Sequence, residues 1–347
     1  MRVIIQIPCF NEQDYLPETI NDLPRYLDGI DEVYWLVIND GSLDNTVGVA
    51  INAGVDGVVS HTQNLGLARA FQTGLEASLW LGADIIINTD ADNQYNAEDI
   101  QKLIDPIINH SADYVVGVRP ISDIEHFSPT KKMLQKLGSK IVSGLGKNSI
   151  EDTTSGFRAM NRKTALRLNI FNDYTYTLET LIQSGQLKLN TVSVPIRVNA
   201  KTRSSRLISS TFDYLKRSSS TIIRSFLTYN PLKIFITGGS IAMVFALALA
   251  IRYLFFYFNG DGMGHVQSLL LAVILFVGGS SAWMLGFQAD LTSVNRRLIE
   301  DVLQRVKRVE STFLNKSNHD FPDLTDARWD YLDKKFLKRI RKNEQNK

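Results

Sequence analysis

The chain has 347 residues, with 38 Lys and Arg against 36 Asp and Glu, a formal net charge of +2 and a single cysteine. This length supports a well-buried core and excludes a disordered chain or a disulfide-stapled miniprotein. The near balance of charge leaves no overall basic excess for binding nucleic acid. Cys9 lies in an apolar run and has no partner for an internal disulfide, which predicts an inert core thiol in a reducing compartment.

The first part of the chain alternates apolar runs of strand length with helical patterns. The expected strands are at residues 3–7, 33–38, 55–59, 85–88 and 114–118, and the helices between them lie near 15–26, 67–81 and 98–108. This rhythm predicts an α/β fold, Rossmann-like, with a mostly parallel sheet joined by right-handed crossovers. Ligands of such sheets bind beyond the carboxyl ends of the strands, where the polar clusters of this sequence fall.

Two later segments, 234–258 and 266–287, are nearly continuous apolar runs. As helices, each exceeds the roughly 30 Å of a bilayer core, which predicts two transmembrane helices rather than the alternative of two buried core helices. Residues 207–230 read as an amphipathic helix with basic residues, lying on the membrane surface or packed on the main domain. The connector 259–265 contains no Lys or Arg whereas both flanks do, so we expect both termini in the cytoplasm.

A pair of acidic residues suggests a metal site. Asp90 and Asp92 follow the expected strand at 85–88 and are separated by one residue, so their carboxylates can converge on one ion. Hard oxygen ligands suit Mg²⁺ or Mn²⁺, which keep coordination positions open for diphosphate oxygens. Turns are rich in Asp for other reasons, and it is the place of the pair at a strand end that favours the metal.

Six segments in order carry a family likeness: PCFNE (8–12), NDGSLDNT (39–46), NLGLARAFQTGLE (64–76), DADNQ (90–94), GVR (117–119) and DTTSGFRAM (152–160). Together they resemble family 2 glycosyltransferases, above all the branch that makes polyprenyl-phosphate sugars. The resemblance covers about residues 1–230 and implies a nucleotide-sugar-binding domain of the GT-A type. The paired C-terminal spans are similar to those of bacterial members of this branch.

The resemblance implies a site for a UDP- or GDP-sugar donor. It assigns the nucleotide to Pro8, Phe10, Asn11, Glu12, Asp40, Gly66 and Arg69. It assigns the metal to Asp90, Asp92 and Gln94, with Gln94 either a third ligand or an orienting residue. The family often has two acidic residues where this chain has Asn39 and Asp40, so position 39 keeps a hydrogen-bond acceptor but lacks the charge.

The acceptor side implied by the resemblance is a set of cations for a lipid phosphate. With Asp90 and Asp92, the catalytic residues expected are Arg119 of the GVR segment and Arg158 of the SGFR loop. The family commonly has an arginine where this chain has Gln135, so Lys136 or Lys132 is the substitute considered. The acceptor-phosphate group is then Arg119, Lys132, Lys136, Ser139, Arg158, Arg203 and Arg206.

These parts predict an inverting, metal-dependent transfer of a sugar to a polyprenyl (undecaprenyl or dolichyl) phosphate at the membrane. One alternative is transfer to a sugar hydroxyl of a lipid-linked glycan, with Asp152 or Glu179 as base. Another is a membrane scaffold that retains the fold without turnover. A nicotinamide oxidoreductase is disfavoured because no G-x-G-x-x-G follows the first strand.

The expected organisation has four parts. Residues 1–206 form a cytosolic catalytic domain, 207–230 a juxtamembrane amphipathic helix, 231–290 a transmembrane hairpin, and 291–347 a cytosolic charged helix and polar tail. Two spans alone make a thin anchor, which favours a homo-oligomer.

Overall fold

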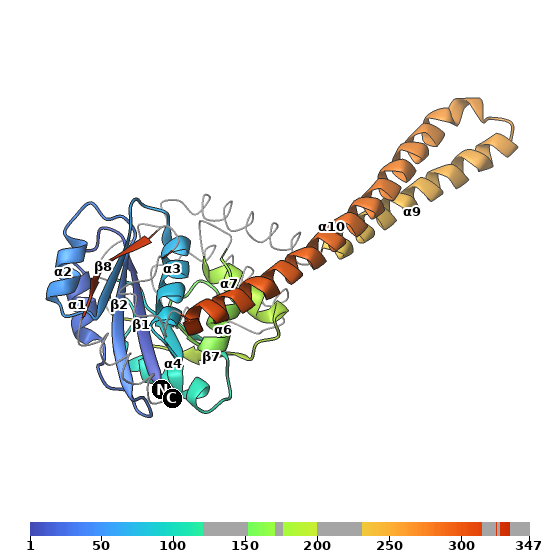
Figure 1. The fold of residues 1–347 in the computed structure, drawn as a ribbon. Helices are drawn as coiled ribbons and strands as arrows, with labels where there is room; N and C mark the ends of the chain where they lie inside the picture. Colours follow the sequence, from blue (N-terminus) through green and yellow to red (C-terminus); the bar gives the residue numbers. More distant parts are fainter. Residues whose placement is uncertain (121–151, 171–175, 200–230, 314–323, 325–326, 334–347) are drawn as a thin grey trace. The chain divides into compact units, whose positions relative to one another are not determined.

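The computed structural model describes residues 1–120, 152–170, 176–199, 231–313, 324 and 327–333 (Figure 1). The chain divides into two compact units, one made of Met1–Thr221 with Leu303–Lys347 and the other of Ile222–Val302. The first unit contains all the strands of the described residues, and the second contains most of the two long apolar helices.

The first unit is built on one mixed sheet whose described strands follow the order β7-β5-β6-β4-β1-β2-β3-β8. β1 pairs in parallel with β2 and β4, and β2 pairs in parallel with β3. β6 runs antiparallel between β4 and β5, and β8 runs antiparallel to β3. The strands are β1 (Arg2–Cys9), β2 (Glu32–Asn39), β3 (Gly57–His61), β4 (Ile85–Asn88), β5 (Tyr114–Val118), β6 (Arg158–Asn161), β7 (Thr191–Pro195) and β8 (Ala327–Leu332).

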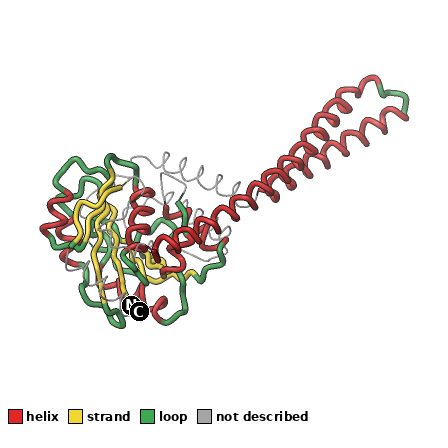
Figure 2. The backbone as a smooth tube through the Cα atoms, viewed as in Figure 1, coloured by secondary structure: helices red, strands yellow, loops and turns green. Residues whose placement is uncertain are grey.

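Helices cover both faces of the sheet (Figure 2). Their bounds are α1 (Leu16–Asp22), α2 (Thr46–Asn52), α3 (Leu67–Trp80), the short 3₁₀ helix η1 (Ala97–Asp99), α4 (Ile100–Ile108), α6 (Arg162–Arg167) and α7 (Tyr176–Gln186). The five strands and the helices expected from the sequence up to residue 118 are present, with small differences at their ends. The mostly parallel α/β fold is therefore confirmed.

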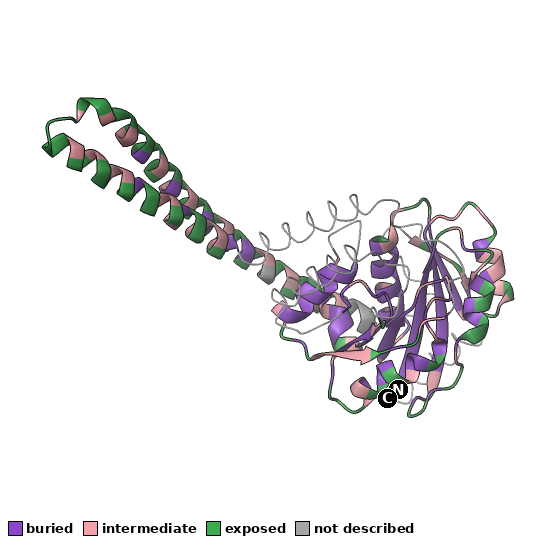
Figure 3. Ribbon diagram, turned by 180° about the vertical axis from the view of Figure 1, so that it is seen from behind, coloured by how far each residue is buried: buried purple, intermediate pink, exposed green. Residues whose placement is uncertain are grey.

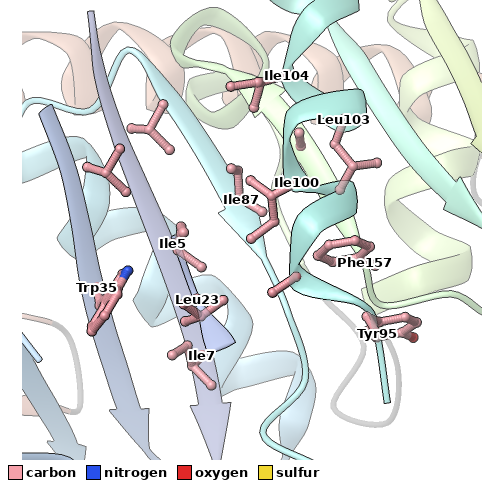
Figure 4. Packing of buried hydrophobic residues seen from close by; sticks show 14 of the residues in the cluster. Ile5, Ile7, Leu23, Trp35, Ile87, Tyr95, Ile100, Leu103, Ile104 and Phe157 are labelled. Carbon is pink, nitrogen blue, oxygen red and sulfur yellow. The ribbon is translucent and has the colours of Figure 1, made fainter. Parts of the chain in front are cut away.

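The alternation of β1 explains how the layers are held. Ile5 and Ile7 point into a core shared with α4, where Ile100 and Leu103 meet them (Figure 4). Gln6 faces the other side of the sheet, where a side chain at Gly74 of α3 would collide with it. Because successive residues of a strand point to opposite faces, a strand apolar on both sides is buried by both layers. All eight residues of β1 are buried, as Figure 3 shows for the strands in purple.

The second unit is an antiparallel pair of helices, α9 (Pro231–Phe258) and the first part of α10 (Val266–Phe313), joined through the 3₁₀ turn η2 (Met263–His265). Both helices are long and apolar enough to cross a membrane, and their apolar side chains are largely exposed (Figure 3). The two helices meet through glycine: a Cβ on Gly239 would lie 2.7 Å from the carbonyl oxygen of Gly279. Trp283 also donates an Nε1–H bond of 3.3 Å to the carbonyl of Ile236. Small residues let apolar helices approach closely.

The C-terminal region differs from the expected polar tail. α10 is continuous to Phe313, as the charged helix predicted, but residues 327–332 then form β8 at the edge of the sheet. The sequence pattern predicts no strand here, because the tail is charged and β8 has only six residues. The described part of this tail therefore belongs to the same unit as the α/β domain.

Candidate active site

The acidic pair Asp90 and Asp92 lies at the carboxyl end of β4, in the middle of the sheet. Burial, with the charge of Asp92 added to it, raises the pKa of Asp90 to about 7, although Arg119 and a hydrogen bond from Tyr95 oppose that rise. The negative charges of two such neighbouring carboxylates repel each other unless a cation binds between them. This pair therefore fits a divalent metal better than it fits an unliganded turn.

The described residues contain no group of three or more His, Cys, Asp and Glu side chains that could hold a metal. A Mg²⁺ or Mn²⁺ ion at Asp90 and Asp92 would thus take its other ligands from amide oxygens, water or a bound diphosphate. Gln94 lies two residues on, and its backbone N–H donates to Asp92 Oδ1 at 3.3 Å. That bond closes a turn which holds the Asp92 carboxylate in place.

The loop before β6 packs directly against Asp90. A Cβ on Gly156 would lie 2.7 Å from Asp90 Oδ1 and 2.9 Å from the hydroxyl of Tyr176, so any larger residue would force one of these side chains to move. The backbone N–H of Gly156 donates to the Tyr95 hydroxyl at 2.9 Å, and its carbonyl accepts from Asn88 Nδ2 at 2.9 Å. The glycine of the SGFR segment is therefore held beside Asp90 by hydrogen bonds at both its N–H and its carbonyl.

Arg158 departs from its predicted role in acceptor binding. Its side chain is fully buried, and its guanidinium donates to five protein oxygens, on Thr153, Ser155, Tyr114, Thr177 and Thr180. A guanidinium bonded in this way ties the 152–158 loop to α7 and β5 and has no face open to a ligand. We therefore correct its assignment from acceptor ligand to structural support of the loop.

Arg119, at the end of β5, makes a two-pronged ion pair with Asp152. Its Nε donates to Asp152 Oδ2 at 2.7 Å, and its Nη2 donates to Oδ1 at 3.2 Å and to Thr154 at 2.9 Å. Although burial acts to raise it, the pKa of Asp152 is held below its ordinary value by the charge and hydrogen bonds of Arg119. The fixed guanidinium also stands close enough to Asp90 to stabilise its charge.

Asp40, which the resemblance assigns to the nucleotide, organises the loop before α3 instead of facing a ligand. Its side chain is buried, and Oδ1 accepts from the backbone N–H of Leu65 at 2.8 Å while Oδ2 accepts from Gly66 at 2.9 Å. His61 Nδ1 lies 2.7 Å from Oδ1, and its Nε2 lies 2.9 Å from the Thr73 hydroxyl. Asp40 thus fixes the entry to α3, and we correct its expected direct contact with the nucleotide. His61 was missed because a lone histidine in an apolar strand carries no motif.

The other residues expected to bind the nucleotide lie around the ends of β1 and β3. Pro8 is buried within β1, opposite Ile38, while Phe10 just after the strand is 38% exposed. Asn11 adopts a left-handed φ of 55° and accepts the N–H of Leu43 at 2.8 Å. Glu12 follows as a buried residue, and Arg69 is exposed on α3, three residues after Gly66, the N-cap of that helix. Of this set, Phe10 and Arg69 are the most exposed, and Asn11 is half-buried.

The structure places Glu179, whereas several of the expected acceptor residues and one predicted helix lie outside the described residues. Glu179 is buried on α7, with Gln183 Nε2 at 3.4 Å from its Oε1. The structure does not describe the amphipathic helix at 207–230 or the acceptor residues Lys132, Lys136, Ser139, Arg203 and Arg206.

Comparison with known proteins identifies the family. Residues 4–167 match the family model described as glycosyl transferase family 2. A UDP-N-acetylglucosamine–dolichyl-phosphate N-acetylglucosaminyltransferase of Methanococcus voltae is 31% identical over 220 residues, covering 56% of this chain and 84% of that protein. An undecaprenyl-phosphate mannosyltransferase of Micrococcus luteus is 28% identical over 209 residues, covering 56% of this chain and 83% of that protein.

Among solved structures, the fold is similar to glucosyl-3-phosphoglycerate synthase of Mycobacterium tuberculosis, crystallised with Mn²⁺, UDP-glucose and phosphoglyceric acid. The TM-score is 0.51 at 20% sequence identity, and the match covers 65% of this chain and 78% of that chain. With the family model and these relatives, the chain belongs to glycosyltransferase family 2.

Proposed function

We propose that this protein transfers a sugar, with inversion, from a nucleotide sugar to a polyprenyl phosphate in a divalent-metal-dependent reaction. The observation that carries the proposal is the half-buried Asp90 and Asp92 pair at the carboxyl end of β4, beside the fixed guanidinium of Arg119. Support comes from the relatives above, whose names specify dolichyl phosphate and undecaprenyl phosphate. The apolar helices α9 and α10 support work at a membrane.

The chemistry asks for charge stabilisation more than for proton transfer. A divalent ion on Asp90 and Asp92 would supply positive charge to the diphosphate leaving group. A phosphate monoester is largely a dianion at neutral pH and can attack the anomeric carbon without a general base. The state of Asp152 agrees with this, because a carboxylate ion-paired with Arg119 and held at a low pKa is a poor base.

The proposal gives each side of the site its own residues. Arg119 and its fixed charge serve the phosphates, while Phe10 and Arg69 serve the donor nucleotide. The cations of the undescribed segments, Lys132, Lys136, Arg203 and Arg206, complete the acceptor pocket in this proposal. The proposal includes a cytoplasmic catalytic unit and cytoplasmic termini, which the distribution of Lys and Arg around the hairpin supports.

The test is a donor and acceptor screen with the full chain in detergent. UDP-glucose, UDP-N-acetylglucosamine, GDP-mannose and related donors are each incubated with polyprenyl phosphate and Mn²⁺ or Mg²⁺. We expect one donor to give a lipid-linked product whose sugar is released by mild acid, and EDTA to abolish its formation. Glycosylation of a lipid-linked sugar, with polyprenyl phosphate ignored for every donor, would instead establish a hydroxyl acceptor.

A further inference from the structure

The C-terminal strand β8 contains a bulge that points a carboxylate at the donor side of the sheet. In its pairing with β3, Val58 lies opposite Tyr331 and Val59 opposite Trp329. Asp330 is therefore an extra residue that has no paired residue on β3. The side chains reflect this register shift. Trp329 and Leu332 are three residues apart and would point to opposite faces of a regular strand, yet both approach Gly57. Bulges often redirect a side chain, and here the redirected side chain is Asp330.

Asp330 begins a chain of hydrogen bonds that runs through the ends of three strands. Ser60 of β3 donates its hydroxyl proton to Asp330 Oδ2. Ser60 in turn accepts from Asn39 Nδ2 of β2 at 2.9 Å, and Asn39 Oδ1 accepts the backbone N–H of Ser42 at 3.0 Å. The Ser42 hydroxyl then accepts the backbone N–H of Asn11 at 2.9 Å, in the loop after β1.

The direction of these bonds follows from the donors and acceptors available. A carboxylate only accepts hydrogen bonds, so Ser60 must donate its single hydroxyl proton to Asp330. Toward Asn39 the Ser60 hydroxyl can therefore act only as an acceptor. The amide of Asn39 must then present its NH₂ to Ser60 and its oxygen to Ser42. Ser60 is 2% exposed and Asn39 is 5% exposed, so water cannot readily replace a lost partner.

From this arrangement we infer that Asp330 is a positioning residue for the nucleotide pocket and acts through Ser60 and Asn39. The inference rests on the proposed function, because it takes the 10–12 and 40–42 loops as the donor site. The backbone of the 40–42 loop is also constrained at Gly41. This glycine has a φ of 67°, and a side chain there would collide with the backbone of Gln63. The strand that follows the membrane hairpin thus fixes the shape of the donor site.

The inference also accounts for an amide at position 39. An aspartate there would bring a second carboxylate to Ser60, which has one proton to donate, and would add charge beside Asp40. Asn39 and Asp330 are therefore a matched pair, one donating to Ser60 and the other accepting from it. Exchanging the two functional groups should preserve the pattern, and changing one alone should not.

The experiment measures nucleotide binding to the full chain in detergent. UDP and GDP are titrated separately by calorimetry with Mn²⁺ present, and the melting temperature of every variant is recorded. We expect Asn39→Asp and Asp330→Leu each to weaken binding of the nucleotide that wild type prefers by about three- to tenfold, as loss of one buried hydrogen bond would. Asp330→Asn alone should stay within about twofold, because its amide oxygen can still accept from Ser60.

The decisive variant combines Asn39→Asp with Asp330→Asn, and we expect binding to return to within about twofold of wild type. The matched control is Leu332→Ala on the same strand, which should lower the melting temperature without weakening nucleotide binding. Should Asp330→Leu fail to fold, Ser60→Ala removes the same link and should weaken binding to a similar extent. Unchanged binding in Asn39→Asp, or no recovery in the double variant, would overturn the inference. If wild type binds neither nucleotide, the donor assignment of the proposed function fails, and the inference falls with it.

Discussion

Arg119 holds Asp152 through both carboxylate oxygens, with Nε at 2.7 Å from Oδ2 and Nη2 at 3.2 Å from Oδ1. The relationship separates the two possible acceptors. A base for a sugar hydroxyl must take up a proton near neutral pH, whereas Asp152 keeps its negative charge because Arg119 lowers its pKa against the effect of burial.

Asp152→Asn is therefore expected to lower kcat/KM by about tenfold through loosening of Arg119, with no change in the pH dependence of the remaining activity. The measurement is a kcat/KM profile between pH 5 and 9 with the donor found in the screen. Asp28→Asn, at an exposed position on the surface, serves as the control. Complete loss of transfer in Asp152→Asn would favour a hydroxyl acceptor.

Asp92→Asn tests the metal site. We expect turnover to fall by roughly 10³ or more, with the fold intact, because stabilisation of the leaving-group charge is worth several kcal/mol. Circular dichroism and the melting temperature check the fold, and Mn²⁺ titration of activity checks the site. Near-normal metal-dependent activity would contradict the assignment of Asp92.

Gly156→Ala tests the contact beneath the acidic pair. The new Cβ would stand 2.7 Å from Asp90 Oδ1, so the carboxylate must move or rotate. Since displacement by about 1 Å can cost 10²-fold in rate, we expect a fall in kcat of that order with a modest loss of stability. Steady-state kinetics with saturating Mn²⁺ measure it. An alanine variant with wild-type kcat would show that the loop does not position Asp90.

Arg158→Ala distinguishes structural support from acceptor binding. Five buried oxygens each lose the hydrogen bond that Arg158 donates, so we expect the free energy of unfolding to fall by about 3 kcal/mol or more. Chemical denaturation measures the change. An acceptor ligand predicts another result, a stable protein with a raised KM for polyprenyl phosphate alone.

The orientation of the hairpin is open to labelling of intact cells. Asp261→Cys in the short connector is expected to react with an impermeant maleimide, and Asn346→Cys is not. The native thiol gives little background, because Cys9 is buried and burial raises its pKa well above the ordinary value. Reaction at position 346 without reaction at position 261 would reverse the orientation.

The sequence could predict those parts of the fold that its local patterns encode. The apolar runs and helical patterns up to residue 118 predict the parallel half of the sheet, and the ends of its strands predict where Asp90 and Asp92 lie. β6 was not predicted, since it is four residues long and inserts antiparallel between β4 and β5. Its first residue is Arg158, so the burial of that arginine was hidden along with the strand.

The same limit applies to polar residues whose partners are distant in sequence. Asp40 looks like a ligand contact in its motif, yet its oxygens are taken by His61 and by the backbone of Leu65 and Gly66. The sequence alone does not show which carboxylates accept hydrogen bonds from the protein itself and which face a ligand. The partner of Ser60 is farther away still, 270 residues along the chain.

The place of β8 has a consequence for synthesis. Until residues 327–332 leave the ribosome, β3 has an open edge, although every other described strand of the sheet has already been made. The apolar helices are translated before that edge is closed, so insertion into the bilayer would precede completion of the sheet. The membrane anchor would then form before the sheet of the α/β unit is complete. Until β8 pairs with β3, the unpaired edge of β3 would be a target for chaperones or for mispairing.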